Sequence, residues 1–171
     1  TKPDIVVTNY VSASATVSVF LNKNDGTGAF FAKVDYTVGN YPSGVVIYDM
    51  TGDGLPDIAT SNYVGVGGGT VTVLANNGGG STSFSTPIAQ ASYATGASPR
   101  QLAAGDFNGD GKPDLAATIY EAGTISVLYG TGTAGSYTLL PKSDITVGGS
   151  PWGIVAGDIN NDGRLDLVVT R

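Results

Sequence analysis

Short runs of alternating apolar and polar residues recur along the chain, separated by turn-forming residues. Near the N-terminus these runs occupy residues 4–8, 16–21, 31–38 and 44–49. Alternation with a period of two is typical of strands that bury one face, and the intervening segments NKNDGTG and VGNYPSG carry turn chemistry. No apolar spacing of 3.6 residues extends over a helical length. The pattern therefore predicts an all-β fold.

One segment of eight or nine residues recurs at a nearly constant interval. It reads KPDIVVTNY at 2–10, LPDIATSNY at 55–63, KPDLAATIY at 112–120 and RLDLVVTR at 164–171. Its aspartates, called anchors below, are Asp4, Asp57, Asp114 and Asp166, spaced by 53, 57 and 52 residues. Four short strands in a repeat of about 40 to 50 residues are typical of a β-propeller blade.

The expected architecture is a single repeat domain over residues 1–171, built from β-propeller blades of four antiparallel strands. About three blades are expected in this chain, either as a partial propeller or as half of an oligomeric one. The blade-like repeats are expected at approximately 4–56, 57–113 and 114–165, with a further strand at 166–171. The glycine-rich segments 65–70 and 76–83 are expected to be loops. Neither gives a phosphate-binding GxGxxG between a strand and a helix.

Composition excludes several classes of protein. The chain has no Cys and no His, which excludes a disulfide framework, thiolate zinc sites, cysteine nucleophiles and the Ser-His-Asp triad. A net charge of −6 with only eight basic residues argues against nucleic acid and anionic membranes as partners. No apolar run approaches the length that spans a bilayer, so membrane insertion is not expected.

The residues that carry chemistry gather in three acidic loops, DMTGDGLPD at 49–57, DFNGDGKPD at 106–114 and DINNDGRLD at 158–166, which hold nine of the fourteen acids. Side-chain oxygens recur at loop positions one, three, five and nine, and the carbonyl at position seven can point inward. The candidate ligands are Asp49, Thr51, Asp53, Leu55 and Asp57, then Asp106, Asn108, Asp110, Lys112 and Asp114, then Asp158, Asn160, Asp162, Arg164 and Asp166. Such sets of hard oxygens suit Ca²⁺ better than Mg²⁺.

Electrostatics point to the same cation. Two carboxylates about 5 Å apart repel by roughly 3 kcal/mol at an effective dielectric near 20, and each loop gathers three. The alternative is that the loops are merely turns rich in Asp, Asn and Gly, but acids recurring in phase at ligand positions favour metal. EF-hands need Glu at position twelve, where Thr60, Ala117 and Val169 stand. Dockerin-type loops lead into helices, whereas strand-like segments follow here. We expect about three Ca²⁺ per chain.

The loops, followed by the strand pattern DLxxT and preceded by the GD of AAGDFNGDG and VAGDINNDG, resemble the FG-GAP or VCBS repeats of integrin-α-type β-propellers. The resemblance covers essentially the whole chain. It implies Ca²⁺ in the loop between the innermost and second strands, an extracellular or cell-surface location, and roles in adhesion, carbohydrate binding or scaffolding. Carried over, the ligands are the aspartates and asparagines given above. Thr51 departs from the pattern, so the first site should be weakest.

A proline precedes each acidic loop by seven residues, and the residue after it differs between repeats: Ser43, Arg100 and Trp152. Variation at a fixed place in a repeat is expected of loops free to specialise, so these three are candidate ligand-binding residues. Trp152 can stack on a sugar ring or pack between neighbouring blades. Tyr10, Tyr63 and Tyr120, each six residues after an anchor, are expected to be structural.

These observations predict a calcium-stabilised binding or adhesion scaffold for carbohydrate or protein ligands. The alternative is a purely structural propeller fragment that self-assembles without a ligand. A glycan-active enzyme is less favoured, because few acids remain for a catalytic pair: Asp25, Asp35, Glu121 and Asp144. We therefore expect no enzyme and no catalytic residues.

The repeat count raises the question of assembly. The chain begins three residues before one anchor and ends five after another, whereas closed propellers need about four to eight blades. We expect either part of a longer array or a unit that completes itself by association. Two copies would supply six blades, so a closed homodimer with contacts near residues 4–8 and 153–170 is preferred.

Overall fold

The computed structural model describes residues 3–64, 68–78, 90–133 and 136–171. All regular elements in these ranges are strands. Among the described residues there is accordingly no helix that could cross a lipid bilayer. The glycine-rich segments predicted as loops lie partly outside the description, at 65–67 and 79–83.

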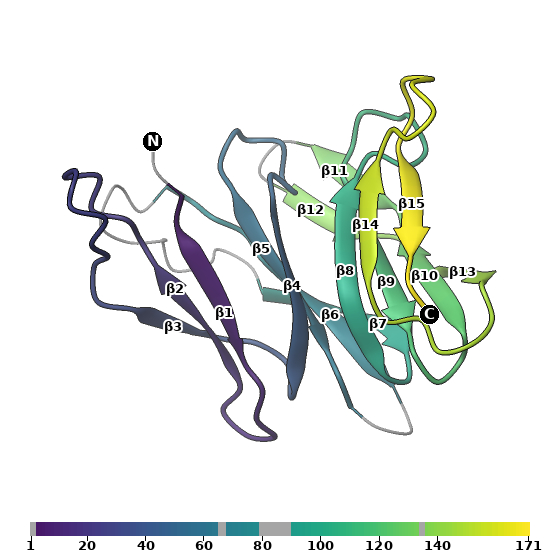
Figure 1. The fold of residues 1–171 in the computed structure, drawn as a ribbon, viewed down its shortest axis with the longest axis horizontal. Coiled ribbons are helices and arrows are strands. Elements are labelled where there is room, and N and C mark those ends of the chain that lie inside the picture. The colour runs from purple at the N-terminus through teal and green to yellow at the C-terminus, as the bar shows by residue number, and fades with distance from the viewer. Residues whose placement is uncertain (1–2, 65–67, 79–89, 134–135) are drawn as a thin grey trace.

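The described strands form five antiparallel sheets, four of which follow one another across the molecule while the fifth is a two-stranded hairpin (Figure 1). The first sheet contains β1 (Ile5–Asn9), β2 (Thr16–Phe20) and β3 (Val34–Thr37). The second contains β4 (Pro42–Tyr48), β5 (Asp57–Asn62), β6 (Gly69–Leu74) and β7 (Gln90–Gly96). The third contains β8 (Pro99–Gly105), β9 (Asp114–Ile119), β10 (Thr124–Leu128) and β13 (Ser143–Thr146). The fourth contains β14 (Ile154–Gly157) and β15 (Asp166–Val169), and β11 (Gly130–Thr133) pairs with β12 (Ser136–Leu139) as a hairpin between β10 and β13.

The second and third sheets confirm the prediction of four antiparallel strands per blade. The four strands predicted near the N-terminus are also present, within a few residues of their expected bounds. The strand at 42–48 pairs with β5 rather than β3, because the chain leaves the first sheet at residues 38–41, where Tyr41 has a left-handed φ of 51°. Each anchor aspartate from Asp57 on begins the second strand of its sheet, directly after the acidic loop.

Alternation along the strands decides which sheet each side chain packs against. The residue one after the anchor packs against the preceding sheet: Ile58 lies with Val17 and Val19, and Leu115 lies with Val71 and Val73. The next residue points the other way, as Ala59 does toward the third sheet. We call these two sides the preceding face and the following face of a sheet. Burial between sheets thus accounts for the period-two pattern.

The first strands of successive sheets lie side by side, with β4 against β8 and β8 against β14. At the closest point a Cβ added to Gly44 would lie 2.5 Å from the carbonyl oxygen of Arg100. Because real Cβ atoms do not come that close, the packing of β4 on β8 requires glycine there.

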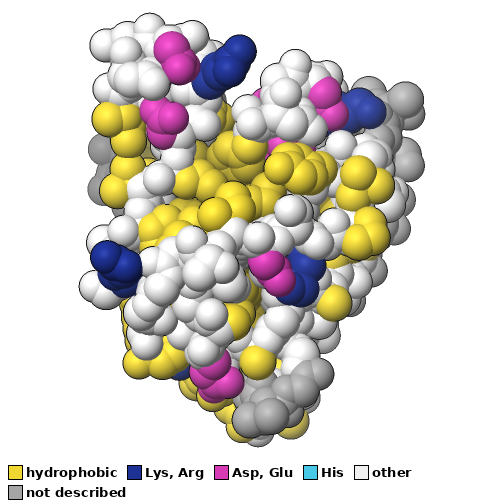
Figure 2. Space-filling view, turned by 90° about the vertical axis from the view of Figure 1, so that its right-hand side faces the viewer, with side chains coloured by type: hydrophobic (Ala, Val, Ile, Leu, Met, Phe, Trp, Pro, Cys, Tyr) yellow, Lys and Arg dark blue, Asp and Glu magenta, His cyan; other side chains and the backbone are white. Residues whose placement is uncertain are grey.

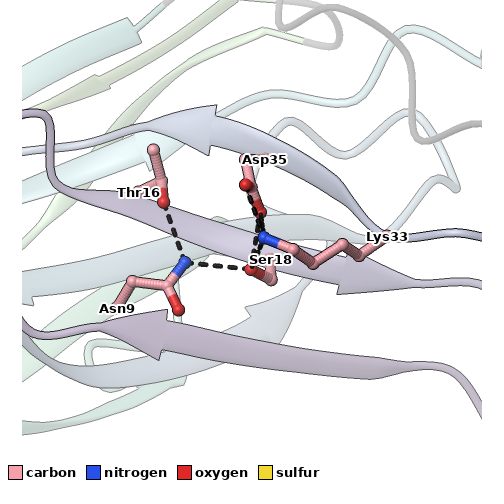
Figure 3. Close-up of polar contacts among 5 residues, drawn as sticks. All are labelled: Asn9, Thr16, Ser18, Lys33 and Asp35. Atoms are coloured by element: carbon pink, nitrogen blue, oxygen red, sulfur yellow. Dashed lines mark hydrogen bonds and ion pairs between the residues drawn. The ribbon is translucent and has the colours of Figure 1, made fainter.

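Polar side chains form ladders across the sheets, shown for the first sheet in Figure 3. Asn9 Nδ2 donates to Thr16 Oγ1 (2.8 Å) and Ser18 Oγ (2.9 Å), and Ser18 Oγ donates to Asp35 Oδ1 (2.6 Å). Lys33 pairs with Asp35 at 2.6 Å. The Lys33 and Ser18 donors hold the pKa of Asp35 below its ordinary value. In the second sheet Asn62 makes the equivalent bonds to two threonines, so the ladder belongs to the repeat.

Candidate functional site

The three acidic loops connect the first and second strands of their sheets: β4 to β5, β8 to β9 and β14 to β15. They lie at one end of the sheets, at the top of Figure 1. This is the position that the resemblance implied for calcium.

All three loops share one backbone conformation. Loop position four is left-handed in each, with φ of 70° at Gly52, 77° at Gly109 and 60° at Asn161. Position six is also left-handed, with φ of 85° at Gly54, 81° at Gly111 and 84° at Gly163. Glycine and asparagine tolerate this region best. The sequence signature therefore encodes a specific loop shape.

The aspartate at position one holds the loop together. Asp106 accepts hydrogen bonds from the N–H groups of Gly109 (2.7 Å), Asp110 (3.2 Å) and Gly111 (2.8 Å). The Gly111 donor leads the others in holding the pKa of Asp106 below its ordinary value. Asp49 accepts from the corresponding three N–H groups, and Asp158 from two. Each loop is thus folded by its own main chain around the side chain of its first aspartate.

The aspartate at position nine ties the loop to the sheet. Asp114 is fully buried, and accepts from Phe107 N–H and from Gly130 N–H, both at 2.8 Å. Asp57 is equally buried, with main-chain donors on both oxygens. Burial raises the pKa of both carboxyls, and the main-chain donors oppose that rise. These anchors are structural in their contacts as well as candidate ligands.

Positions three and five lie together in two of the loops. Asn108 Nδ2 is 3.3 Å from Asp110 Oδ2, and Asn160 Nδ2 is 3.1 Å from Asp162 Oδ2. Thr51 differs: it is buried, and its Oγ1 has no hydrogen-bond partner. The first loop thus differs in structure from the others at position three, where it has Thr51 instead of asparagine.

The donor chemistry of the loops fits calcium, since carboxylate, amide and carbonyl oxygens are its usual ligands. The geometry is not that of an assembled site: within the described ranges no three acidic side chains form a group that could hold a metal ion. A cleft of about 650 Å³ separates the second loop from the third, with Asp106 and Asn108 on one wall and Arg164 on the other. The loops are prefolded and open to solvent on this side.

The opposite end of the sheets carries a cluster around Arg100, the second residue of β8. Its guanidinium carbon lies over the rings of Tyr63 (4.7 Å to the centroid), Trp152 (4.8 Å) and Tyr120 (5.2 Å). Tyr120 and Trp152 also meet edge to face, with centroids 5.8 Å apart. The cluster unites three sheets, because Tyr63 follows β5, Tyr120 follows β9 and Trp152 precedes β14.

Further aromatic rings extend the cluster toward the first sheet. Tyr41 lies 6.3 Å from Tyr63, and Tyr10 lies 5.2 Å from Tyr41, between ring centroids. Tyr10 and Trp152 are the most exposed of these aromatic residues, each a little over half exposed. We call this set the aromatic band: Tyr10, Tyr41, Tyr63, Arg100, Tyr120 and Trp152.

The structure brings together two of the three ligand candidates, Arg100 and Trp152. Ser43 lies near them, but its hydroxyl is within 3.0 Å of the carbonyl oxygens of Pro99 and Arg100, between β4 and β8. Ser61 Oγ donates to the same Arg100 carbonyl at 2.7 Å. Ser43 therefore supports the main chain of Arg100.

Sequence reasoning missed Tyr63 and Tyr120 as partners of Arg100. The signal was present in the repeat. A tyrosine six residues after an anchor immediately follows the second strand of a sheet, and the residue after the proline lies at or just before the start of the first strand. Because the two strands are antiparallel neighbours, these positions meet at the same end.

Comparison with known proteins agrees with this geometry. No curated protein matches the chain. The family model described as FG-GAP-like repeat matches three times, at residues 1–60, 62–117 and 106–169. Repeats of this kind are β-propeller-type modules, are not catalytic in themselves and typically occur in extracellular proteins. With three matches across nearly its whole length, the chain belongs to the family of FG-GAP-like repeats.

Proposed function

We propose that this chain is a calcium-stabilised repeat module that serves as a binding or adhesion scaffold for carbohydrate or protein ligands. The acidic loops would bind the stabilising cation. The opposite end, with its aromatic band, would face the ligand. The two roles are thus assigned to opposite ends of the same sheets.

The observation that carries the proposal is the common conformation of the three loops, with left-handed residues at positions four and six and a folded main chain around the first aspartate. Ca²⁺ would be held by the side chains at positions one, three, five and nine and the carbonyl at position seven. About three ions per chain would offset the formal net charge of −6.

Calcium would stabilise the fold by linkage, because the ligands are brought together only in the folded loop. A site occupied at a hundred to a thousand times its dissociation constant contributes about 3 to 4 kcal/mol. The first site should contribute least, since Thr51 replaces an amide and is buried away from the loop surface.

Calorimetric titration tests this proposal. We expect close to three Ca²⁺ per chain, a markedly higher melting temperature in calcium than in excess chelator, and a smaller effect of Mg²⁺ at equal concentration. Fewer than two sites, or the same melting temperature in calcium and chelator, would contradict it.

We also propose that the module is not itself an enzyme. Of the acids outside the loops, Asp35 and Asp144 each pair with a lysine, and Asp25 accepts hydrogen bonds from its neighbour Thr27. These partners argue against a free carboxylate pair for glycoside hydrolysis. The usual setting of the family supports an extracellular location, which also suits the proposed calcium sites.

Self-association is a second candidate function, favoured by the faces of the first and last sheets. Ile5 and Val7 on the preceding face of the first sheet are 44% and 43% exposed, although their repeat equivalents Ile58 and Ala117 are buried between sheets. On the following face of the fourth sheet Val155 is 60% exposed. Figure 2, which faces this side of the molecule, shows hydrophobic side chains gathered across its middle.

The occupant that fits both faces is a second copy of the chain. Each junction within the chain packs the following face of one sheet against the preceding face of the next. A head-to-tail copy would repeat that junction between the fourth sheet of one molecule and the first sheet of another.

A further inference from the structure

We propose that Arg100 and the rings around it bind the carboxylate of an acidic glycan, a chain of sugar rings that carries carboxyl groups. This inference rests on the proposed function as a binding scaffold and names the ligand class for its aromatic end.

The guanidinium of Arg100 is held by aromatic rings rather than by acids. Three rings lie within 5.2 Å of its central carbon, and the two ion pairs of the described chain both involve lysines elsewhere. An aromatic face attracts the cation but does not replace in-plane acceptors for its N–H groups. Arg100 Nε is shielded from solvent and has no hydrogen-bond partner. Among the described residues no acid pairs with this guanidinium, and the planar fork of its N–H groups matches the two oxygens of a carboxylate.

The position of Arg100 is fixed before any ligand arrives. Its carbonyl oxygen is within hydrogen-bonding distance of the hydroxyls of Ser43 and Ser61, and Gly44 permits the close approach of the two strands. Tyr63, Tyr120 and Trp152 come from three sheets and confine the side chain. Preorganisation of this kind lowers the entropic cost of binding.

The charge distribution suits an anionic ligand. Nine of the fourteen acids lie in the loops at the opposite end of the sheets. At the aromatic end a second cation, Arg171, donates to the carbonyl oxygen of Val147 at 2.8 Å, while Glu121 follows Tyr120. An anion approaching Arg100 therefore avoids most of the negative charge of this acidic protein.

The aromatic band favours a glycan over an acidic peptide. Successive members of the band are 4.7 to 6.3 Å apart, and the band crosses from the first sheet to the fourth. Exposed rings at its ends, Tyr10 and Trp152, offer flat apolar surfaces on which sugar rings can stack. An acidic peptide could form an ion pair with Arg100, but its backbone and side chains would stack less well on a row of flat rings.

Trp152 provides a direct reporter, because it is the single tryptophan of the chain. Its fluorescence is followed while hexamers of galacturonate, alginate and hyaluronan are added to the calcium-loaded full chain. Probes for comparison are carboxyl-reduced hexagalacturonate, which keeps the sugar rings, and hexaglutamate, which keeps the charge. We expect at least one acidic glycan to bind and to change the emission, and both comparison probes to bind at least about tenfold more weakly.

Variants assign the binding to the cluster. Arg100→Gln should weaken the acidic glycan at least about tenfold, and Arg100→Lys, which keeps charge without the planar fork, should weaken it several-fold. Lys23→Gln removes one positive charge at the other end of the sheets and should bind as the parent does. Isothermal titration gives the affinities of all variants, and their melting temperatures in calcium report folding. If Arg100→Gln does not fold, the Arg100→Lys affinity and the wild-type comparison of acidic with reduced hexamer decide.

Three results would overturn the inference: no binding of any acidic hexamer, equal affinity for the carboxyl-reduced hexamer, or tighter binding of hexaglutamate. Each can occur while calcium still raises the melting temperature, in which case the calcium-stabilised module stands and only its ligand class fails. A chain that does not respond to calcium, in contrast, would contradict the proposed function and not the Arg100 site.

Discussion

At the residue scale, each acidic loop contains at least one exposed carboxylate, which is a candidate calcium ligand, and one less exposed carboxylate at position nine, which joins the loop to the sheet. Asp110 is exposed and contacts only its own loop, where it accepts from Lys112 N–H and lies near Asn108. Asp114 is buried and joins the loop to the sheet. Removing one of the exposed carboxylates should therefore affect calcium more than folding.

Asp110→Ala tests this division. In excess chelator its melting temperature should stay close to that of the parent, whereas in calcium it should lose the contribution of one site, about 3 to 4 kcal/mol at saturation. Thermal unfolding with and without calcium measures both quantities. Asp25→Ala, which removes an exposed acid outside the three loops, is the charge-matched control and should keep the full calcium response. A full response in Asp110→Ala would argue against this loop as a site.

Asp35 makes the free energy of unfolding depend on pH. Its pKa is held below the ordinary 3.8 by Lys33 and Ser18, so it contributes stability that is complete above pH 3.8 and is lost as the pH falls through the lowered folded value. In chelator, Asp35→Asn should be slightly less stable than the parent at pH 6. The difference should shrink toward pH 3. A constant difference across this range in thermal melts would show that the ladder does not depend on the charge.

The place of the acidic loops between strands could be predicted from the sequence because their turn chemistry is local, whereas their role as calcium ligands stays a prediction. Loop positions one to nine lie within nine residues, and their glycines occur where the backbone is left-handed. The Arg100 cluster could be predicted only in part. The place of Arg100 and Trp152 in the repeat marks them as candidates. Their contacts with Tyr63 and Tyr120 depend on how neighbouring sheets pack, which the sequence does not reveal. The hydroxyl of Ser43 contacts the main chain of β8 instead of facing a ligand.

At the scale of elements, the fold depends on close packing between the first strands of successive sheets. The alternating pattern predicted the strands and their two faces, because both faces are set by local period. It did not assign the strand at 42–48 to the second sheet, because alternation within a strand does not show with which neighbouring strand it pairs.

Two glycine variants measure how tight this packing is. Gly44→Ala places a Cβ 2.5 Å from the Arg100 carbonyl and should destabilise the protein by about 1 to 3 kcal/mol. Gly157 in β14 has open space around it and no left-handed φ, so Gly157→Ala should be tolerated. Chemical denaturation with constant slope gives both values. Equal stability of the two variants would mean that β4 and β8 can separate at no cost.

At the scale of the whole molecule, the exposed faces of the first and fourth sheets are the surfaces through which the proposed assembly would form. A head-to-tail homodimer would cover both, and light scattering at tens of micromolar should report twice the mass of the chain. Val155→Lys and Val7→Lys should each shift the protein toward monomer, because each places a charge in one half of the junction. Val64→Lys, at an exposed valine outside both faces, should not.

Mixing the two disruptive variants separates head-to-tail from symmetric contacts. The intact preceding face of one variant can still meet the intact following face of the other, so the mixture should recover dimer that neither variant forms alone. A monodisperse monomer of the parent chain would instead show that the sheets are stable without a partner.

The three acidic loops place nine of the fourteen acids at one end of the sheets, together with Lys112 and Arg164, whereas Arg100 and Arg171 lie at the other end, so that negative charge is concentrated at the loop end. On a positively charged support in calcium-free buffer, the molecule will therefore adsorb with its acidic end down and its aromatic end toward the solution. Calcium bound to the loops as proposed above would neutralise the adsorbed end, weaken that orientation and release the protein. The cation proposed to stabilise the fold would thus also control which end of an immobilised molecule faces the solution.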